Sequence, residues 1–553
     1  MLQWLRQYRR AMLPGDISAG IVVAMMMVPQ GMAYALVAGL PPVVGIYASI
    51  LPPLLYALFG TSMTQSVGPM AIISLMTAAV LAPLAVAGSG LYTVLAAQLA
   101  LMAGAVLLAC GLLRIGFLAN FFSRPVMSGF TIGSAVVISI GQLKPLLGAA
   151  LPGVHGPSAM LGIGSLVLLV LARQYLAPLL ARLGLSPEAA NTGSRLAPML
   201  VVIGATALVP LLGLVAAGVQ TTGDVPSGLP QLNLASSSAH WRSLLQPALL
   251  IGFMIFVISM SAAQTLALKR QEKLNSNFEL LGLGAANLAS ALSGGFPVTG
   301  SMSRSAVNFS AGANTPLASV ITAVLLAAAL VAPTGWLALL PLPTLAATII
   351  VAVLGMLELA TLRMCLRYDR GDALALLATA GGVLALGVEA GVIVGVLLSM
   401  GTLIWRESRP HIAVLGRIAG TEHFRNIRRY PHAITMLDVL VLRIDAGLFF
   451  GNVEAVSARI EEELKTRPAT RHLVLVLSAV NSIDTSALFS LTELNRDLRR
   501  RAITLHLAEV KGPVMDRLRH SDMLEALSGQ VFMSTDNACD ALASPPQPGE
   551  YVI

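Results

Sequence analysis

The chain has 553 residues, of which 56% are hydrophobic and 11% charged, and its mean hydropathy is +0.78. Soluble domains carry about 25% charged residues, so this composition excludes an ordinary soluble protein and indicates a membrane protein. The formal net charge of +8 comes from residues 1–405, which hold 17 Lys and Arg against 9 Asp and Glu, while residues 406–553 hold 18 of each. We therefore predict a membrane unit followed by a soluble unit. We interpret the basic excess as membrane topology rather than affinity for nucleic acid.

Twelve full-length apolar segments and two short, broken ones follow the basic start of the chain. A helix needs about 20 apolar residues to cross a bilayer. The full-length candidates lie near residues 17–37, 42–58, 91–112, 126–146, 160–175, 196–219, 246–266, 278–293, 316–333, 341–358, 372–387 and 389–405. The two short segments lie near residues 66–82 and 302–310.

The distribution of basic residues supports fourteen crossings. Fourteen Lys and Arg fall on the side of the N-terminus, whereas Lys144 and Arg242 fall on the other side. This asymmetry fits the positive-inside rule, and it disappears if one short segment is left out, because every later loop then changes sides. We therefore predict a multi-pass protein of the cytoplasmic (inner) membrane with both termini in the cytoplasm and an external loop over residues 220–245.

The short segments are the third and the tenth of the fourteen, so they take the same position in each half of a seven-plus-seven arrangement. Halves with an odd number of spans are inverted relative to each other. Paired short segments interrupted by Gly and Pro in an inverted repeat indicate a transporter with a binding site near the bilayer midplane. The alternative is a pair of re-entrant loops with a packing role only.

Both short segments place Pro and Gly directly before a helix, in "SVGPMA" (66–71) and "PVTGSMSRS" (297–305). Irregular backbone at membrane depth is tolerated where it is buried in protein or lines a cavity. Each half-helix then begins inside the membrane with free backbone N–H groups, which favour an anion. Thr299, Ser301 and Ser303 add hydroxyl donors, so we predict an anion cradle.

Arg304 lies about one turn into the second half-helix. A charge at this depth costs about 2.5 kcal/mol or more unless it is compensated. One hypothesis is a structural lock, in which Arg304 pairs with helix C-terminal carbonyls or with Glu389, the only acid that the sequence places well inside a span. The other hypothesis is that Arg304 supplies positive potential to a bound anion, and we favour it because ionisable residues inside membranes are usually functional.

The first span contains Pro29, which is expected to break or kink the helix. Gln30 and Tyr34 are four residues apart and therefore share one helix face. This polar face predicts a cavity wall, although Gln30 bonding to a neighbouring helix is an equal alternative.

The soluble unit alternates short apolar runs with helical patterns from about residue 432. Apolar runs near 437–451, 471–480 and 502–510 suit buried strands, and residues 452–466, 485–501 and 512–527 suit helices. This order predicts an α/β layer domain. Asp484 and Ser486 lie at a helix start in "SIDTSAL" (482–488), and simple N-capping is the favoured interpretation.

Several patterns that would imply a cofactor are missing from the sequence. The cysteines, Cys110, Cys365 and Cys539, are far apart and have no metal-ligand spacing, so neither disulfides nor zinc is predicted. The chain has no Walker-type phosphate loop, so ATP is not implied. We therefore expect no cofactor.

Several stretches resemble the sulfate permease (SulP) family of anion carriers, and the resemblance runs along nearly the whole chain. They are "VPQGMAYALVAGLPPVVGIYASILPPLLYALFGTS", "SVGPMAIISLM", "GGFPVTGSMSRSAVNFSAGANTPLAS" and "FRNIRRYP". The resemblance implies a fold like that of uracil permeases, with fourteen transmembrane segments in a seven-plus-seven inverted repeat. It also implies a transport domain over 1–405, a linker over 406–431 and a cytoplasmic STAS domain over 432–545.

The resemblance further implies a core domain (spans 1–4 and 8–11) that moves like an elevator against a gate domain (spans 5–7 and 12–14). The anion site then lies between the half-helices. The residues that match the family's site positions are Gln30, Tyr34, Pro69, Met70, Ser303 and Arg304. Homodimers and a cytoplasmic partner of the STAS domain are also implied, and Ser486 takes a position that is phosphorylated in some bacterial antagonists.

One position departs from the family pattern, because Ile258 stands where many cation-coupled members carry an acid. Coupling through this position is therefore not expected, and Glu389 is the alternative coupling candidate. Sulfate is the family's default substrate, while bicarbonate, chloride and dicarboxylates remain compatible. The rival functions are an anion channel and a nucleobase permease. The permease is disfavoured because its site needs carboxylates on spans 8 and 10.

Overall fold

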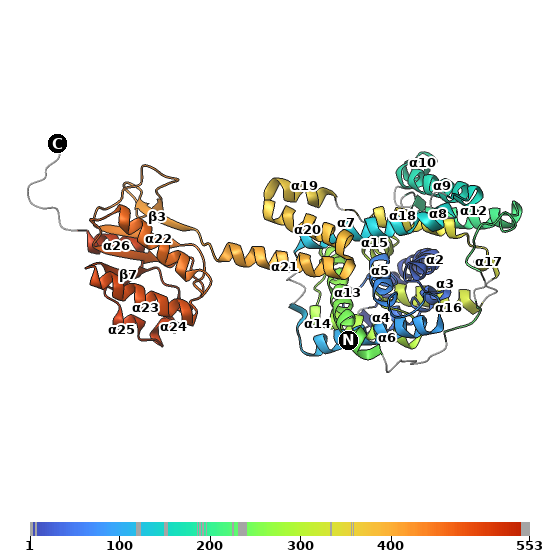
Figure 1. Cartoon of the computed structure of the whole chain (residues 1–553), viewed down its shortest axis with the longest axis horizontal. Coiled ribbons are helices and arrows are strands. Elements are labelled where there is room, and N and C mark those ends of the chain that lie inside the picture. The colour runs from blue at the N-terminus through green and yellow to red at the C-terminus, as the bar shows by residue number, and fades with distance from the viewer. Residues whose placement is uncertain are drawn as a thin grey trace, which may run out of the picture. The chain divides into compact units, whose positions relative to one another are not determined.

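The computed structural model of the chain is shown in Figure 1. It describes residues 4–5, 8–117, 123–148, 153–184, 186, 190, 193–194, 196–223, 226–230, 240–331, 335–355, 357 and 359–543, with the backbone alone at 268, 269, 389 and 392. The chain divides into two compact units, Met1–Ser399 and Met400–Ile553. Each unit is described by itself.

Among the described residues of the first unit, the regular elements are helices apart from two dipeptide strands. Its first half contains η1 (Arg10–Met12), α2 (Leu13–Val37), α3 (Pro42–Tyr47), α4 (Leu51–Phe59), β1 (Val67–Gly68), α5 (Ala71–Leu81), α6 (Gly90–Leu112), α7 (Arg124–Gly141), α8 (Leu143–Leu147), α9 (Gly156–Leu171), η3 (Ala172–Leu176), α10 (Ala177–Arg182) and α12 (Ala197–Leu211). Its second half contains α13 (Trp241–Arg270), α14 (Ser276–Leu292), β2 (Thr299–Gly300), α15 (Met302–Ser310), α16 (Leu317–Val331), α17 (Gly335–Ala338), α18 (Leu342–Leu354), α19 (Leu359–Tyr368), α20 (Arg370–Leu386) and the start of α21 (Val388–Glu407).

Each of the fourteen predicted segments coincides with at least one of these helices. Among the described residues, seven helical stretches are long and apolar enough to cross a membrane, and α5, α12 and α16 are shorter apolar helices. The two broken segments have the expected form, because β1 precedes α5 and β2 precedes α15. Pro29 does not break the first span, since α2 continues from Leu13 to Val37 around it.

Close backbone approach holds α2 against α3. A Cβ added at Gly45 would lie 1.9 Å from the carbonyl oxygen of Gly31, so no side chain fits between the two helices there. Small residues allow this kind of contact where helices pack inside a membrane. The contact fixes the part of α2 that carries Gln30 and Tyr34.

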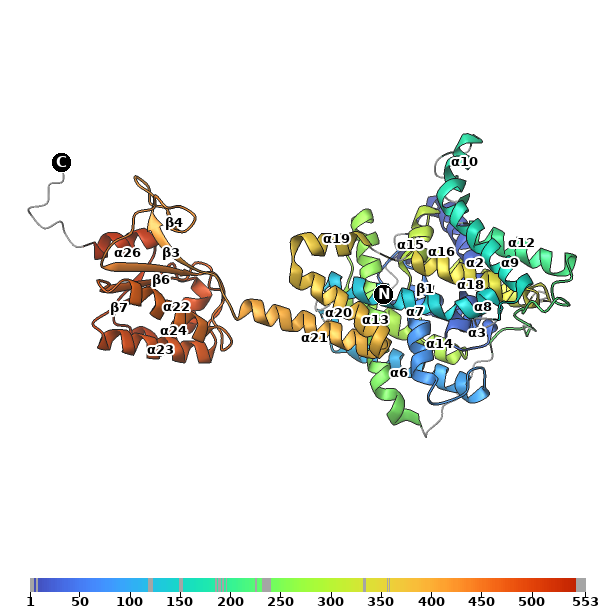
Figure 2. The ribbon, with the colours of Figure 1, turned by 45° about the horizontal axis from the view of Figure 1, so that its top comes forward.

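The second unit is a six-stranded sheet with helices on both faces (Figure 2). Its strands are β3 (Ile412–Arg417), β4 (Phe424–Asn426), β5 (Val439–Ile444), β6 (His472–Val476), β7 (Thr504–Ala508) and β8 (Val531–Phe532), in the order β4-β3-β5-β6-β7-β8. Its helices are α22 (Val453–Thr466), α23 (Thr485–Arg500), α24 (Gly512–Arg519), α25 (Met523–Ala526) and α26 (Thr535–Leu542). Strands β5 to β8 are parallel, as the alternating strand and helix pattern predicts.

The predicted linker over 406–431 is wrong for most of its length. α21 continues to Glu407, and residues 412–426 contribute β3 and β4 to the sheet. β3 pairs antiparallel with β5, with Ile412 opposite Ile444, and this pairing buries the apolar residues 413–415. The soluble domain therefore begins about twenty residues before the predicted boundary at 432.

His506 of β7 makes the soluble unit sensitive to acid. Its Nδ1 accepts a hydrogen bond from the backbone N–H of Gln530 at 3.1 Å, so the ring proton lies on Nε2, which is 3.2 Å from Nδ1 of His472. Burial, together with the smaller effect of the neighbouring His472, lowers the pKa of His506 to about 4. Below about pH 6.5, the ordinary pKa of histidine, the ring of His506 binds a proton in the unfolded chain but stays neutral in the folded chain.

We expect the soluble unit to lose up to about 3 kcal/mol of stability as the pH falls from 6.5 to 4. The measurement is pulsed hydrogen exchange of the full chain in a series of urea concentrations at pH 7.5 and at pH 5. The quantity compared is the urea concentration at which half of the molecules have lost protection in the peptides that contain β7, which we call the urea midpoint. His506→Gln should show a smaller acid-induced shift of this midpoint than the wild type. Equal shifts in the two proteins would contradict the assignment to His506.

Candidate functional site

The two broken segments meet in a short antiparallel ladder. Val67 pairs with Gly300 and Gly68 pairs with Thr299. The ladder is extended at the end next to Val67 and Gly300, because the N–H of Ser301 donates to the carbonyl of Ser66 at 3.1 Å and the N–H of Ser66 donates to the hydroxyl of Ser305 at 2.9 Å. This pairing fixes the starts of α5 and α15 close to each other.

Both half-helices begin without a side-chain cap. Met70 and Ser301 are the N-cap residues of α5 and α15, and each has extended backbone and no side-chain cap bond among the described residues. The first N–H groups of a helix have no partner within the helix, and they carry the positive end of its dipole. The hydroxyls of Ser301 and Ser303 lie 3.3 Å apart at the start of α15. These groups are the donors that an anion requires.

Arg304 is the largest fully buried side chain of the described residues. Its Nη1 donates to the carbonyl of Pro69 at 2.6 Å, while Nε and Nη2 have no hydrogen-bond partner among the described residues. A Cβ added at Gly68 would lie 3.4 Å from Nη2, which is an ordinary van der Waals contact, so the guanidinium packs beside the backbone of the first broken segment. Arg304 thus spans both broken segments and retains unused donors.

The structural-lock hypothesis for Arg304 needs one correction. The carbonyl that Arg304 contacts belongs to Pro69, which precedes the start of α5, and not to the C-terminus of a helix. The side chain of Glu389, the other proposed partner, lies outside the described part of the chain.

Gln65 connects the ladder to two neighbouring helices. Its Nε2 donates to the carbonyl of Ser259 in α13 at 3.1 Å and also contacts the hydroxyl of this serine. Its Oε1 lies 2.7 Å from the hydroxyl of Tyr56 in α4. All three side chains are buried, so they hold the first broken segment in a fixed position.

Two buried carboxylates hold the loops that flank the ladder, and the sequence did not single them out. Glu279 of α14 accepts from the N–H groups of Thr61 and Ser62 at 2.7 and 2.9 Å. Asp16 of α2 accepts from the N–H of Thr315 at 3.0 Å and from its hydroxyl at 2.6 Å. Both acids lie in the first turns of their helices, at the ends of the predicted spans, so they do not test the prediction that Glu389 is the only acid well inside a span. Both acids carry loops of the site rather than face its cavity.

A cavity of about 380 Å³ lies beside the half-helix of α15. One wall comes from α2 and α15, and the opposite wall comes from α9, η3, α10, α12 and α18. Of the predicted site residues, Gln30, Tyr34 and Ser303 line it. The cavity's lining does not include the predicted residues Pro69, Met70, Ser301 and Arg304, which are buried around the ladder.

The opposite wall carries a cation that the sequence analysis did not place in the site. Arg173 of η3 lines the cavity, and its Nη1 lies 3.5 Å from the carbonyl of Val351. Gly355 leaves room for it, since a Cβ there would lie 2.6 Å from Nη1. A helical pattern in the sequence shows which residues share a face, but not that this face closes a cavity.

The loop at Asp484 behaves as a helix cap. Asp484 Oδ1 accepts from the N–H of Ala487 at 2.8 Å, which confirms the N-capping interpretation, and Oδ2 accepts from the N–H of Phe450 at 2.9 Å. Ser486 is exposed in the first turn of α23.

Comparisons with known proteins give consistent results. The family model described as the sulfate permease family matches residues 13–379, and the STAS domain model matches residues 430–538. A probable sulfate transporter of Mycobacterium tuberculosis is 36% identical over 555 residues, which cover 97% of this chain and 96% of that protein. The chloroplastic sulfate transporter 4.1 of Arabidopsis thaliana is 34% identical over 556 residues, which cover 96% of this chain and 80% of that protein.

Solved structures share the fold. The murine solute carrier 26 family member A9 anion transporter in the inward-facing state matches with a TM-score of 0.88 at 23% identity, over 98% of this chain and 94% of that one. The transmembrane domain of a cyanobacterial bicarbonate transporter matches with a TM-score of 0.59 at 22% identity, over 70% of this chain and 98% of that one.

Proposed function

The chain belongs to the sulfate permease family, and we propose that it is a secondary transporter that carries a small anion, with sulfate as the first candidate. It is a multi-pass membrane protein of a transporter family and not an enzyme. The observation that carries the proposal is Arg304, a fully buried cation with two unused N–H donors beside two uncapped half-helices. A buried charge without a counter-charge is costly, so a bound anion would stabilise it.

The proposed transport cycle starts with an anion in the cavity beside α15. Ser303, Gln30 and the free N–H groups at the start of α15 replace its water, while Arg304 and the start of α5, which do not line the cavity, supply positive potential. Tyr34 limits the cavity on the side of α2. Pro69, Met70 and Ser301 shape the backbone that presents these donors. The site needs no cofactor for this function.

The movement that we propose follows the two walls of the cavity. The wall of α2 and α15 belongs to the core (spans 1–4 and 8–11), and the wall of α9, α12 and α18 belongs to the gate (spans 5–7 and 12–14). Sliding of the core against the gate would expose the anion to the other side of the membrane. The loops held by Asp16 and Glu279 support this movement, because they tie the broken segments to core helices that move as one body.

Coupling and assembly are further parts of the proposal. Ile258 is apolar and buried in α13, so coupling to a cation through this position is not expected, and anion exchange or coupling through Glu389 remain the candidates. We also propose a homodimer with both termini in the cytoplasm and a soluble domain that binds a cytoplasmic partner. The resemblance to the family and the asymmetry of basic loop residues support these points.

The test is uptake into proteoliposomes with labelled sulfate, bicarbonate, chloride and a dicarboxylate, with and without proton and sodium gradients. We expect saturable sulfate uptake that is stimulated by anion on the opposite side. Unitary currents without saturation would instead favour an anion channel. Uptake of uracil with no anion transport would favour a nucleobase permease.

Gln30→Ala should raise the KM for the anion about tenfold, because it removes one hydrogen-bond donor from the site. Gln264→Ala is the matched control, since Gln264 is an exposed glutamine of α13 outside the lining of the cavity. The measurement is the concentration dependence of initial uptake for both variants. Equal KM values for the two variants would contradict a contact between Gln30 and the substrate.

A further inference from the structure

Helix α19 lies at the edge of the membrane unit beside α20, and it does not line the cavity of the proposed transport path (Figures 1 and 2). It connects α18 to α20 on the side of the membrane that holds most of the basic loop residues. One face of α19 packs through Leu362 and Cys365 against Ile132 of α7 and Ala373 of α20. This contact determines which residues of α19 face outward.

The outward face of α19 combines arginines with large apolar side chains. Arg363 and Arg367 are exposed and lie about one turn apart, so they share the face opposite to the packed one. Apolar side chains flank them, and each is more than half exposed: Leu359 and Leu366 on one side, Met364 and Tyr368 on the other. This distribution is typical of a helix in the membrane interface, where apolar side chains enter the acyl region and cations stay at the headgroups.

Two more arginines lie close to this face. α7 and α20 run parallel, because a Cβ added at Gly129 would lie 2.2 Å from the carbonyl oxygen of Leu376, and the contact of Gly133 lies four residues further along both helices. Arg124, the first residue of α7, is therefore level with Arg370, the first residue of α20, and both are exposed. We call these four residues the arginine surface: Arg124, Arg363, Arg367 and Arg370.

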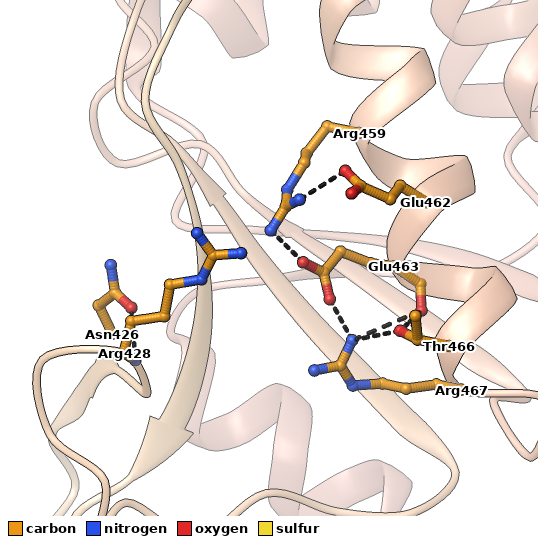
Figure 3. A network of polar contacts seen from close by, with 7 residues as sticks. All are labelled: Asn426, Arg428, Arg459, Glu462, Glu463, Thr466 and Arg467. Atoms are coloured by element: carbon orange, nitrogen blue, oxygen red, sulfur yellow. Dashed lines mark hydrogen bonds and ion pairs between the residues drawn. The ribbon is translucent and has the colours of Figure 1, made fainter.

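The arginine surface keeps an excess of positive charge. None of its four side chains makes a hydrogen bond or an ion pair with the part of the chain that the structure describes. The carboxylates nearest in sequence are those of Asp369 and Asp372, and Asp369 accepts from two backbone N–H groups as the N-cap of α20. Figure 3 shows the opposite case in the soluble unit, where Glu463 contacts both Arg459 and Arg467.

We propose that the arginine surface binds the headgroups of acidic phospholipids in the cytoplasmic leaflet. Guanidinium groups bind phosphate oxygens through two parallel hydrogen bonds, and the exposed apolar side chains beside them favour a ligand with acyl chains over a free solute. α7 and α20 form spans 5 and 13, which belong to the gate in the proposed transport cycle. Bound lipid then holds the gate at the membrane surface while the core slides. This last step rests on the proposed function, whereas lipid binding does not.

The experiment is native mass spectrometry of the full chain in detergent, titrated with phosphatidylglycerol or with phosphatidylcholine. We expect the wild type to bind phosphatidylglycerol more tightly. The double variant Arg363→Ala with Arg367→Ala should bind phosphatidylglycerol about twentyfold more weakly, because each basic residue near an anionic headgroup contributes a factor of about five. Equal affinities of the wild type for the two lipids would overturn the proposal.

Arg496→Ala with Arg500→Ala is the matched control, since these arginines are exposed on α23 with the same spacing of four residues. Its affinity for phosphatidylglycerol should equal that of the wild type. Arg363→Lys with Arg367→Lys keeps the charge and should recover most of the affinity that the alanine variant loses. The proposal is wrong if the alanine variant binds phosphatidylglycerol as tightly as the control does, or if lysine recovers none of the lost affinity.

Glycerol phosphate carries the phosphate group without acyl chains and therefore tests the kind of ligand. We expect it to displace phosphatidylglycerol only at concentrations at least about a hundredfold higher than that of the lipid, because it lacks the apolar contacts. Displacement at equal concentrations would show that the ligand is a soluble anion and not a lipid. Binding is measured without transport, so its failure leaves the proposed function intact, and a failure of anion uptake leaves lipid binding intact.

Discussion

Arg304→Ala is expected to lower the initial rate of anion uptake at least about a hundredfold, with the yield of inserted protein nearly unchanged. The variant removes two unused donors and the positive charge beside the uncapped half-helices. Arg304 does not line the cavity, so the expected loss is that of its positive potential at the anion, and a hundredfold lower rate corresponds to about 2.7 kcal/mol of substrate or transition-state stabilisation. The measurement is uptake into proteoliposomes per reconstituted molecule.

Arg304→Lys and Arg242→Ala provide the matched comparisons. Lysine keeps the charge but loses the planar fork, so it should recover part of the uptake and remain about tenfold below the wild type. Arg242 is an exposed arginine at the start of α13, and its removal should leave uptake within about twofold. Uptake by Arg304→Ala with unchanged KM and rate would show that Arg304 does not serve the anion.

The lock hypothesis predicts a different outcome for the same variant. If the bond from Arg304 to the carbonyl of Pro69 mainly stabilises the fold, Arg304→Ala should lower the melting temperature in detergent and reduce the yield. We expect little change, because the variant removes a buried, largely unpaired charge together with that single bond. Melting curves of Arg304→Ala and Arg242→Ala therefore separate the two hypotheses.

Local sequence signals were sufficient for the helices and for the two broken segments. Pro and Gly before a helix mark an interrupted span wherever it lies, and the matched positions of the two segments indicated a repeat. The sequence sets the helix face that Gln30 shares with Tyr34 but leaves open whether this face lines a cavity or packs on a helix, and the structure places both residues in the lining of the cavity. These inferences needed only neighbouring residues.

Contacts between distant segments could not be predicted in this way. Glu279 lies after a basic stretch and resembles a residue at the end of a span, yet its partners at Thr61 and Ser62 are more than two hundred residues away. Strand β3 was assigned to a linker because its pairing with β5 is not encoded in its own pattern. A long-range hydrogen bond leaves no periodic signal in a single sequence.

Gly300→Ala is expected to destabilise the membrane unit by about 3–6 kcal/mol, from overpacking and from buried polar groups left without partners. A Cβ at Gly300 would lie 1.7 Å from Nε2 of Gln65 and 2.6 Å from the hydroxyl of Ser259. Gln65 cannot move away without breaking its bonds to Ser259 and Tyr56. We therefore expect a lower melting temperature in detergent and loss of anion uptake.

Gly68→Ala is the control in the same ladder, because its added Cβ would meet the end of the Met27 side chain at 2.6 Å, and a flexible side chain can move. Its destabilisation should stay below about 1.5 kcal/mol. The double variant Gly300→Ala with Gln65→Ala removes the obstacle, so it should be more stable than the sum of the two single effects predicts. If the changes in melting temperature of the two single variants add up to that of the double variant, the side chain of Gln65 is not what blocks a Cβ at position 300. Other contacts would then hold the ladder in position.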